Sequence, residues 1–244
     1  MGRLEGKTAL ITGASSGYGR GTAYAFAQEG CNLVITARRE ERLREVKENC
    51  EREYGVKVVY YAGDAREEET AVNTIRLGIE TFGKIDILIN NAGIGRVQTI
   101  TEATLEDYDL IMDTNVRSAF AFSKHIIPEM LKQHYGRIIM VSSCTGINGR
   151  GQEAAYTASK FAVRGLAQSL NMDYLKEGIA VATFCPHAGI TEFEIGHGRD
   201  AEEFAKTGFL TPEDVGNALL TMCLQTGNCY VAEMRLASNN VVFW

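Results

Sequence analysis

Short apolar runs alternate along the chain with longer amphipathic stretches, and this alternation constrains the fold more than any other feature. Seven runs are rich in Val and Ile, and most lack the polar alternation of a strand with one solvent-facing side, so they are typical of strands covered on both faces. The predicted strands are Thr8 to Ile11, Asn32 to Ala37, Lys57 to Ala62, Ile85 to Asn90, Arg137 to Val141, Ala180 to Phe184 and Tyr230 to Leu236. The predicted helices are Tyr18 to Glu29, Glu40 to Tyr54, Glu67 to Phe82, Leu105 to Leu131, Ala154 to Glu177 and Pro212 to Gln225.

This order of elements predicts an α/β fold with a doubly wound parallel sheet of about seven strands and helices on both faces. Parallel neighbours need right-handed crossovers of a dozen or more residues, which the amphipathic stretches supply. No repeat or linker interrupts the 244 residues, so we expect residues 1–244 to form a single domain. The weakly periodic stretch 186–210 is expected to be a substrate-binding loop or lid, and a plain surface excursion is the alternative.

Composition points to a small-molecule partner. The 25 Lys and Arg residues against 31 Asp and Glu residues give a net charge of -6, which argues against a nucleic-acid or anionic-membrane surface. No apolar run approaches the roughly 18 residues that a membrane span requires, and the first seven residues lack the apolar core of a secretory signal, so we expect a cytoplasmic location. The six cysteines form no C-x-x-C pair, and no metal site is predicted.

A glycine-rich turn follows the first predicted strand directly. Gly13 permits a tight turn, while Gly17 and Gly19 allow close approach of the backbone and of the helix that begins here. A pyrophosphate can then lie at the positive N-terminal end of that helix. The strand, turn and helix together predict a dinucleotide-binding site.

The end of the second predicted strand indicates which dinucleotide is bound. An acidic residue that would bond the ribose hydroxyls of NAD is absent, and the chain has Arg38 and Arg39 instead. Guanidinium groups pair well with a 2'-phosphate, so the sequence predicts NADP(H). The alternative is that both arginines only begin a solvated helix with Glu40 and Glu41.

Five motifs follow one another along the chain: the turn from Thr12 to Gly19, the sequence Asn90-Asn91-Ala92-Gly93, Asn115, Ser143 thirteen residues before Tyr156, and the Tyr156-x-x-x-Lys160 pair. In this order and at these spacings they resemble the short-chain dehydrogenase/reductase family over nearly the whole chain. The resemblance implies a Rossmann-like fold and hydride transfer between a nicotinamide and a carbonyl or alcohol. It also implies a catalytic set of Asn115, Ser143, Tyr156 and Lys160.

The chemistry of this set can be argued from the residue types. Tyr156 and Lys160 are four residues apart on a helix and therefore share one face. A phenol has a pKa of about 10, and we expect Lys160 and an oxidised nicotinamide to lower it. Tyr156 would then act as general acid or base, while Ser143 donates a hydrogen bond to the substrate oxygen. By resemblance, Lys160 also holds the nicotinamide ribose and Asn115 anchors a water.

Further residues are assigned to the cofactor and the substrate. By resemblance, Asp64 lies near the adenine, although a helix cap is the alternative, and Thr191 contacts the carboxamide. The predicted cofactor-binding set is Gly13, Ser15, Ser16, Gly17, Tyr18, Gly19, Arg38, Arg39, Asp64, Ala65, Asn91, Ala92, Gly93, Tyr156, Lys160, Pro186, Gly189 and Thr191. The predicted substrate-pocket set, from position alone, is Ile94, Ser143, Cys144, Gln152, His187 and the Phe193 to Phe209 loop.

Two departures from the family pattern stand out. His187 replaces the glycine that usually follows the proline, where it either bonds a polar substrate group or is an ordinary surface histidine. Tyr18 replaces a smaller aliphatic residue. The apolar end Val241 to Trp244 packs either on another subunit or on its own, and the resemblance implies a tetramer or dimer.

The predicted function is therefore an NADP(H)-dependent oxidoreductase acting on a small carbonyl or alcohol. One alternative is reduction of 3-oxoacyl thioesters. The other is a non-catalytic NADP(H)-sensing regulatory protein.

Overall fold

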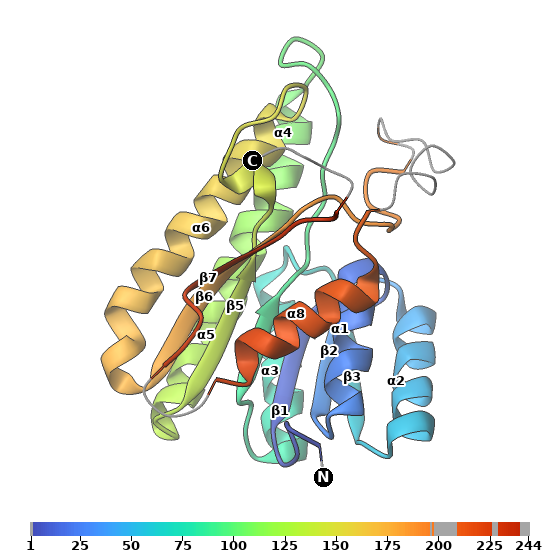
Figure 1. The fold of residues 1–244 in the computed structure, drawn as a ribbon, viewed down its shortest axis with the longest axis vertical. Helices are drawn as coiled ribbons and strands as arrows, with labels where there is room; N and C mark the ends of the chain where they lie inside the picture. Colours follow the sequence, from blue (N-terminus) through green and yellow to red (C-terminus); the bar gives the residue numbers. More distant parts are fainter. Residues whose placement is uncertain (1, 196, 198–208, 226–228, 240–244) are drawn as a thin grey trace.

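A seven-stranded parallel sheet forms the centre of the protein in the computed structural model, which describes residues 2–195, 197, 209–225 and 229–239 (Figure 1). Its strands are β1 (Thr8–Thr12), β2 (Asn32–Ala37), β3 (Val58–Ala62), β4 (Ile87–Asn90), β5 (Gly136–Val141), β6 (Ile179–Pro186) and β7 (Glu233–Leu236). They lie in the order β3-β2-β1-β4-β5-β6-β7, and every neighbouring pair is parallel. The doubly wound parallel sheet predicted from the alternation is confirmed.

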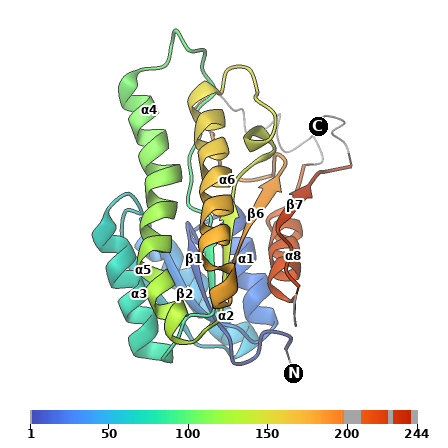
Figure 2. The same cartoon turned by 90° about the vertical axis from the view of Figure 1, so that its left-hand side faces the viewer.

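Helices cover both faces of this sheet. They are α1 (Gly17–Gln28), α2 (Glu40–Tyr54), α3 (Glu68–Phe82), α4 (Leu105–Met112), α5 (Ser118–Lys132), α6 (Ala154–Tyr174) and α8 (Pro212–Cys223). Side chains of α1, α2 and α8 pack into one hydrophobic core, and side chains of α3, α5 and α6 pack into the other. Figure 2 faces the second layer, with α6 in front of the sheet.

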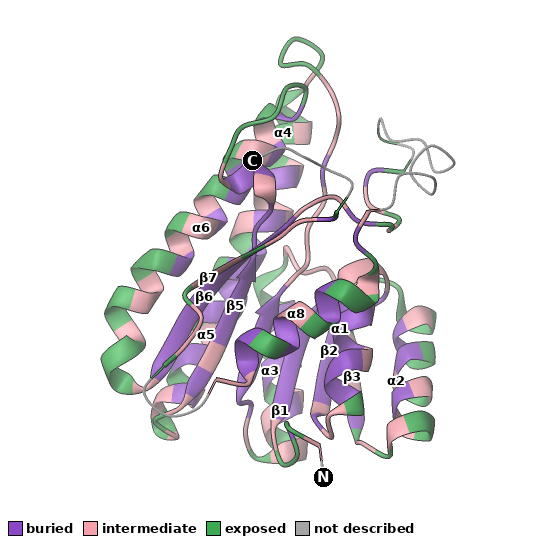
Figure 3. Ribbon diagram, viewed as in Figure 1, coloured by how far each residue is buried: buried purple, intermediate pink, exposed green. Residues whose placement is uncertain are grey.

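The two cores explain why the strands read as unbroken apolar runs. Successive residues of a strand point to opposite faces, so Ile11 enters the core beneath α1 while Leu10 enters the core beneath α3 and α5. Both side chains are fully buried. The burial colours in Figure 3 show the same pattern across the sheet, with most exposed residues on the outer sides of the helices and in the loops, and with Ala62 and Arg235 exposed in the edge strands β3 and β7.

Helices α1 and α8 cross in close contact because each has a glycine at the crossing. A Cβ atom on Gly216 would lie 2.6 Å from the carbonyl oxygen of Gly21. A Cβ atom on Gly21 would in turn overlap with the backbone carbonyl of Pro212. The two glycines therefore let the backbones of α1 and α8 come into contact, and this contact holds α8 against α1.

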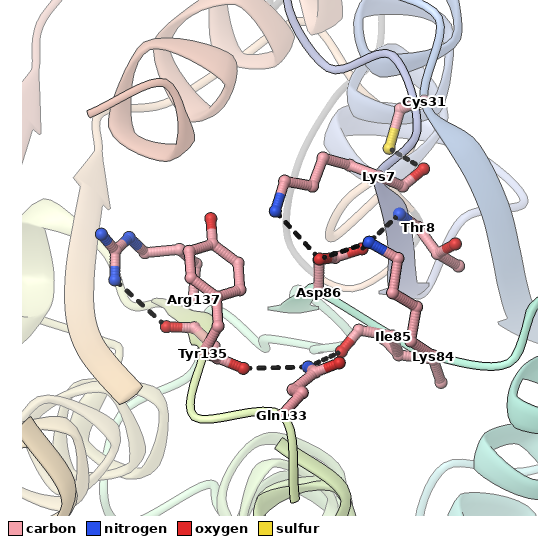
Figure 4. Close-up of polar contacts among 10 residues, drawn as sticks. Lys7, Thr8, Cys31, Lys84, Ile85, Asp86, Gln133, Tyr135 and Arg137 are labelled. Atoms are coloured by element: carbon pink, nitrogen blue, oxygen red, sulfur yellow. Dashed lines mark hydrogen bonds and ion pairs between the residues drawn. The ribbon is translucent and has the colours of Figure 1, made fainter. Parts of the chain in front are cut away.

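A cluster of polar side chains lies at the edge of the sheet where the strands begin (Figure 4). The carboxylate of Asp86 is buried just before β4, and it accepts a 3.0 Å hydrogen bond from the backbone amide of Thr8 in β1. The ammonium groups of Lys7 and Lys84 lie 3.0 and 3.1 Å from its oxygens. Lys7 also lies over the ring of Tyr135, 3.9 Å from the centroid, so the segments before β1, β4 and β5 are joined.

Several predicted bounds shift by one to three residues, as where β4 begins at Ile87 instead of Ile85 and α6 ends at Tyr174 instead of Glu177. Two further differences have a structural context. The expected helix from Leu105 to Leu131 contains a π-helical turn at Asp113–Arg117, because the side chain of Asn115 is bonded to Ile94 from an earlier loop and the backbone accommodates an extra residue. The last strand begins at Glu233 instead of Tyr230, since its register with β6 starts at the Thr183 and Glu233 pair.

Two predicted segments are described in part or not at all. The predicted loop 186–210 is described at 186–195, 197 and 209–210, and its remaining residues lie outside the described residues. The apolar tail Val241 to Trp244 lies outside them entirely. In the part of the chain that the structure describes, no helix has the length and apolar character needed to span a membrane.

Candidate active site

A cavity of about 490 Å³ opens at the carboxyl ends of the strands. Its walls come from the segments that follow β1, β2, β3, β4, β5 and β6. The strand order reverses between β1 and β4, and a parallel sheet of this type offers its ligand crevice at such a point. The volume falls within the roughly 300–1,000 Å³ of ligand pockets.

Most of the residues predicted from sequence line this one cavity. They are Gly13, Ser15, Ser16, Gly17, Tyr18, Arg38, Arg39, Asp64, Ala65, Asn91, Ala92, Gly93, Ile94, Ser143, Cys144, Tyr156, Lys160, Pro186, His187, Gly189, Thr191 and Phe193. Gly19, Asn115 and Gln152 are not in the lining. Gly19 packs against the carbonyl of Gly13, and Gln152 is exposed, with its backbone carbonyl bonded to the amide of Gln98.

The glycine turn forms a cradle with little spare room. Gly13 has a φ of 68°, and a Cβ atom there would lie 3.0 Å from the Cα of Ala92. The side-chain amide of Asn91 donates a 2.8 Å hydrogen bond to the carbonyl of Thr12, which fixes the turn against the loop after β4. Because α1 begins at Gly17 on the cavity wall without a side-chain cap, its first amides can hold a phosphate group.

The guanidinium group of Arg39 lies at the edge of this cradle. It donates hydrogen bonds to the hydroxyls of Ser16 (2.7 Å) and Ser15 (3.3 Å). Arg39 is also the N-cap residue of α2, so its side chain projects from the end of β2 toward the turn. The guanidinium of Arg39 and the hydroxyls of Ser15 and Ser16 lie together in the cavity wall, so these three residues fit an adenosine 2'-phosphate.

Asp64 lies in the wall beside these groups and does not cap a helix. The N-cap of α3 is Glu67, whereas the carboxylate of Asp64 accepts hydrogen bonds from the guanidinium of Arg66 at 2.7 to 3.1 Å. These bonds hold the pKa of Asp64 below its usual value. The carboxylate therefore stays ionised in the cavity wall.

Tyr156 and Lys160 lie one turn apart on α6 and face the other end of the cavity. Both side chains are buried, and the Lys160 Nζ lies 5.6 Å from the centroid of the Tyr156 ring. Lys160 donates a 2.9 Å hydrogen bond to the carbonyl of Val141 at the end of β5. Burial lowers the pKa of Lys160 to about 8, so the ammonium is still charged at neutral pH.

The pKa of Tyr156 in the protein alone shifts upward, opposite to the direction expected for the complex with oxidised cofactor. Burial is the largest cause, and the negative charge of Glu194 adds to the rise. A hydrogen bond with Ser143 acts in the opposite direction. The Lys160 ammonium, which donates its hydrogen bond to Val141, is not among the main influences on this pKa, and the phenol remains protonated at neutral pH.

Asn115 lies beneath the cavity wall, in the π-helical turn. Its side-chain oxygen accepts a 2.8 Å hydrogen bond from the amide of Ile94, and its Nδ2 donates a 2.9 Å hydrogen bond to the carbonyl of the same residue. Nδ2 also donates to the hydroxyl of Ser159, the neighbour of Lys160. Asn115 thus connects the loop after β4 to the helix that carries Tyr156.

Three charged residues of the wall, Arg150, Glu153 and Glu192, were absent from the predicted site residues, whereas Glu194 lies within the predicted Phe193 to Phe209 loop. Glu153 and Glu194 are buried, and Arg150 lies 3.3 Å from the carboxylate of Glu153. Glu194 has a φ of 63°, and its carboxylate lies against Gly95, where a Cβ atom would overlap with it. Arg150, Glu153 and Glu192 belong to no motif, so only the folded chain identifies them.

The ring of Phe193 covers Tyr156 from the segment after β6. The two centroids are 5.5 Å apart, and the planes are tilted by 55°. The ring of Tyr18 packs on Gly189 in the same segment, where a Cβ atom would overlap with its hydroxyl. The described part of this segment therefore forms one wall of the cavity. Among the described residues, no group of three His, Cys, Asp or Glu side chains is arranged to hold a metal ion.

Known proteins are similar to this chain in sequence and in structure. Residues 7–201 match the family model of the short chain dehydrogenase. The oxidoreductase UcpA of Salmonella typhimurium is 40% identical over 187 residues, which make up 76% of this chain and 70% of that protein.

Solved structures share the whole fold. An alcohol dehydrogenase from Thermococcus sibiricus, complexed with 5-hydroxy-NADP, has a TM-score of 0.89 at 24% identity and covers 98% of this chain and 99% of its own. A 3-ketoacyl-(acyl-carrier-protein) reductase from Brucella melitensis, complexed with NADH, has a TM-score of 0.86 at 29% identity and covers 96% of both chains.

Proposed function

The chain belongs to the short-chain dehydrogenase family, and we propose that it is an NADP(H)-dependent oxidoreductase that interconverts a carbonyl and an alcohol. One observation carries the proposal. The buried pair of Tyr156 and Lys160 lines the same cavity as the glycine turn and the two arginines after β2. A proton donor, a cation and a dinucleotide cradle thus share one enclosed volume.

The chain supplies the proton chemistry. When bound, the nicotinamide supplies or accepts the hydride. In the reductive direction Tyr156 gives its proton to the carbonyl oxygen, and the raised pKa of its phenol means that this proton is present at neutral pH. The Ser143 hydroxyl donates a hydrogen bond to the same oxygen as negative charge develops there. Lys160 holds the nicotinamide ribose, and Asn115 keeps α6 and the loop after β4 in register and anchors a water.

The preference for NADP(H) rests on the end of β2. Arg39 already donates to Ser15 and Ser16, and Arg38 lines the cavity beside it. No acidic residue lies at this position to accept ribose hydroxyls as in the NAD arrangement. A 2'-phosphate adds an anion that pairs with guanidinium groups, whereas a ribose hydroxyl carries no charge to pair with them.

Reduction of 3-oxoacyl thioesters is the second candidate. The likeness to a 3-ketoacyl-(acyl-carrier-protein) reductase at 29% identity favours it. The two candidates share every step at the reacting carbonyl and differ in the remainder of the substrate. Activity on a 3-oxoacyl thioester, with little activity on short ketones, would favour the second candidate.

A non-catalytic nucleotide sensor is the third possibility. Binding of a dinucleotide requires the glycine turn and the arginines, but it does not require a phenol, an ammonium group and a serine hydroxyl buried together. The gathering of Ser143, Tyr156 and Lys160 at one end of the cavity therefore favours an enzyme.

The decisive experiment is a panel of carbonyl compounds and alcohols, followed by the absorbance of NADPH and of NADH. We expect turnover with at least one carbonyl and a lower KM for NADPH than for NADH. A KM for NADH equal to or below that for NADPH would contradict the cofactor assignment.

The Tyr156→Phe variant tests the catalytic assignment. We expect turnover to fall at least a thousandfold while the Kd for NADPH stays within about twofold, because the ring is retained and only the proton donor is lost. The Tyr174→Phe variant, changed at the other end of α6, is the matched control. A Tyr156→Phe enzyme that keeps a large part of the wild-type rate would sink the assignment.

We also propose that the protein is a homo-oligomer, a tetramer or a dimer. Phe120 on α5 and Phe161 on α6 are exposed on the helix layer shown in Figure 2. Exposed phenyl groups on two neighbouring helices favour a contact with another subunit. Light scattering of a Phe120→Glu, Phe161→Glu double variant should give a lower mass than the wild type, and an unchanged mass would contradict the use of this face.

A further inference from the structure

Glu192 joins two arginines across the mouth of the cavity. One carboxylate oxygen accepts a 2.8 Å hydrogen bond from Arg39, and the other accepts a 2.6 Å hydrogen bond from Arg42. The arginines lie at the start of α2, about 150 residues earlier in the chain. These two bonds hold the pKa of Glu192 below its usual value, so the carboxylate carries a full negative charge at neutral pH.

The position of this carboxylate matters because Arg39 has a second task. The same guanidinium that binds Glu192 also donates to the hydroxyls of Ser15 and Ser16. All four residues line the cavity. Under the proposed function, on which this step rests, Arg39 must turn its donors to the 2'-phosphate of NADP(H).

A carboxylate and a phosphate cannot both use those donors without a cost. Each carries negative charge, and each is best satisfied by paired N–H groups of a guanidinium. We propose that Glu192 competes with the 2'-phosphate for Arg39 and thereby sets how tightly NADP(H) is held. Arg42 keeps the carboxylate in place when Arg39 turns to the phosphate.

The size of the effect follows from the exposure of the pair. The side chains of Arg39, Glu192 and Arg42 are 44%, 50% and 42% exposed, so solvent screens the interaction. Exposed ion pairs are worth up to about 1 kcal/mol, which corresponds to roughly fivefold in a dissociation constant. The competition therefore tunes the affinity for NADP(H) and does not block binding.

The test compares two small probes that differ only in the phosphate of interest. Adenosine 2',5'-bisphosphate carries the 2'-phosphate, and adenosine 5'-monophosphate lacks it. Calorimetric titration of the Glu192→Gln variant, which keeps the shape and removes the charge, should show binding of the bisphosphate about fivefold tighter than in the wild type. The dissociation constant of the monophosphate should stay unchanged.

Glu40→Gln is the matched control. Glu40 is the neighbour of Arg39 in the chain and carries the same charge, but its carboxylate lies 3.4 Å from Arg44 instead. We expect this variant to bind both probes as the wild type does. An equal gain in both variants would show a general effect of net charge and would overturn the competition.

The remaining outcomes separate the two proposals. A Glu192→Gln variant that binds the bisphosphate no more tightly than the wild type, while both prefer it over the monophosphate, overturns the competition and leaves the NADP(H) assignment intact. Absence of any preference for the bisphosphate in the variant overturns the NADP(H) assignment itself.

Discussion

The phenol hydroxyl of Tyr18 donates a 3.0 Å hydrogen bond to the backbone carbonyl of His187. These are the two positions at which the sequence departs from the family pattern around the cofactor, and the structure shows that they are in contact. Gly189 makes room for the ring of Tyr18. The start of α1 is thus tied directly to the segment that follows β6.

Removing the hydroxyl in Tyr18→Phe should loosen the cavity wall that follows β6, where we propose that the cofactor binds. One hydrogen bond has a net value of about 0.5–1.5 kcal/mol, so the KM for NADPH should rise roughly twofold to tenfold. The control is Tyr24→Phe, which removes a hydroxyl from the same helix where it meets Asn49. Steady-state kinetics that show equal effects for both variants would contradict a specific role of Tyr18.

The imidazole of His187 is predicted to contact the substrate. It lines the cavity, and its ring lies 6.5 Å from that of Phe209. Burial, helped by the positive charge of Arg150, lowers its pKa below the usual value, so the neutral imidazole is favoured at neutral pH. His187→Ala should raise the KM for the substrate several-fold and leave the Kd for NADPH unchanged.

The pH profile provides a check on this role. In the wild type the His187 imidazole should contribute no change in the substrate KM from pH 7 to pH 8, because it does not titrate there. Any change in this range is expected from Lys160, whose pKa is about 8, and should persist in the His187→Ala variant. His125→Ala, at an exposed contact with Glu68, is the control and should have no effect. Unaltered substrate kinetics in His187→Ala would rule out the substrate contact.

Burial of the charged Lys160 ammonium should lower the free energy of unfolding. The pKa is about 8 in the protein against about 10.5 in an unfolded chain, so between these values the unfolded chain binds more protons and stability rises with pH. Lys160→Met should raise the free energy of unfolding at pH 7 by about 2 kcal/mol while it abolishes turnover.

This gain should be complete below pH 8 and absent above pH 10.5. Calorimetric Tm values at pH 7 and pH 10.5 measure it, with exposed Lys176→Met as the control. A Lys160→Met variant that is less stable than the wild type at pH 7 would contradict the prediction that the buried Lys160 charge destabilises the fold.

The crossing of α1 and α8 gives a prediction on stability. A methyl group at Gly216 would lie 2.6 Å from a backbone oxygen, so Gly216→Ala should cost about 1–3 kcal/mol and lower the Tm by several degrees. Gly165→Ala is the matched change on α6, where nothing lies within 4 Å, and it should stabilise by up to about 1 kcal/mol. Equal Tm shifts would contradict the close crossing.

Six of the seven strands were predictable to within two residues, and the central ones are buried on both faces, whereas the partly buried β7 begins three residues later than predicted. A run such as Asn32 to Ala37 has a single polar residue, Thr36, within its buried stretch, and its observed bounds are the same. The glycine turn was equally clear, since it follows β1 without a gap. The motif residues then gather in one cavity because the carboxyl ends of parallel strands share an edge.

Other features depend on partners that are distant in the chain. The π-helical turn follows from the bonds of Asn115 to Ile94, 21 residues earlier, and no local pattern signals it. In the sequence, Gly216 is only a residue that disfavours the helix in which it lies, and its packing role becomes visible once α1 lies against α8. The link from Glu192 to Arg39 spans 153 residues and joins two loops that carry no shared motif.

The buried carboxylate of Asp86 has a consequence for engineering this protein. The cluster around Asp86 lies at the edge of the sheet where the strands begin. The cavity lies at the other edge, about 16 Å away if the five residues of β1 are taken at 3.3 Å each. Substitutions separated by that distance usually combine additively. Heat tolerance can therefore be selected on one rim and substrate range on the other, and libraries evolved in parallel can be merged without either undoing the other.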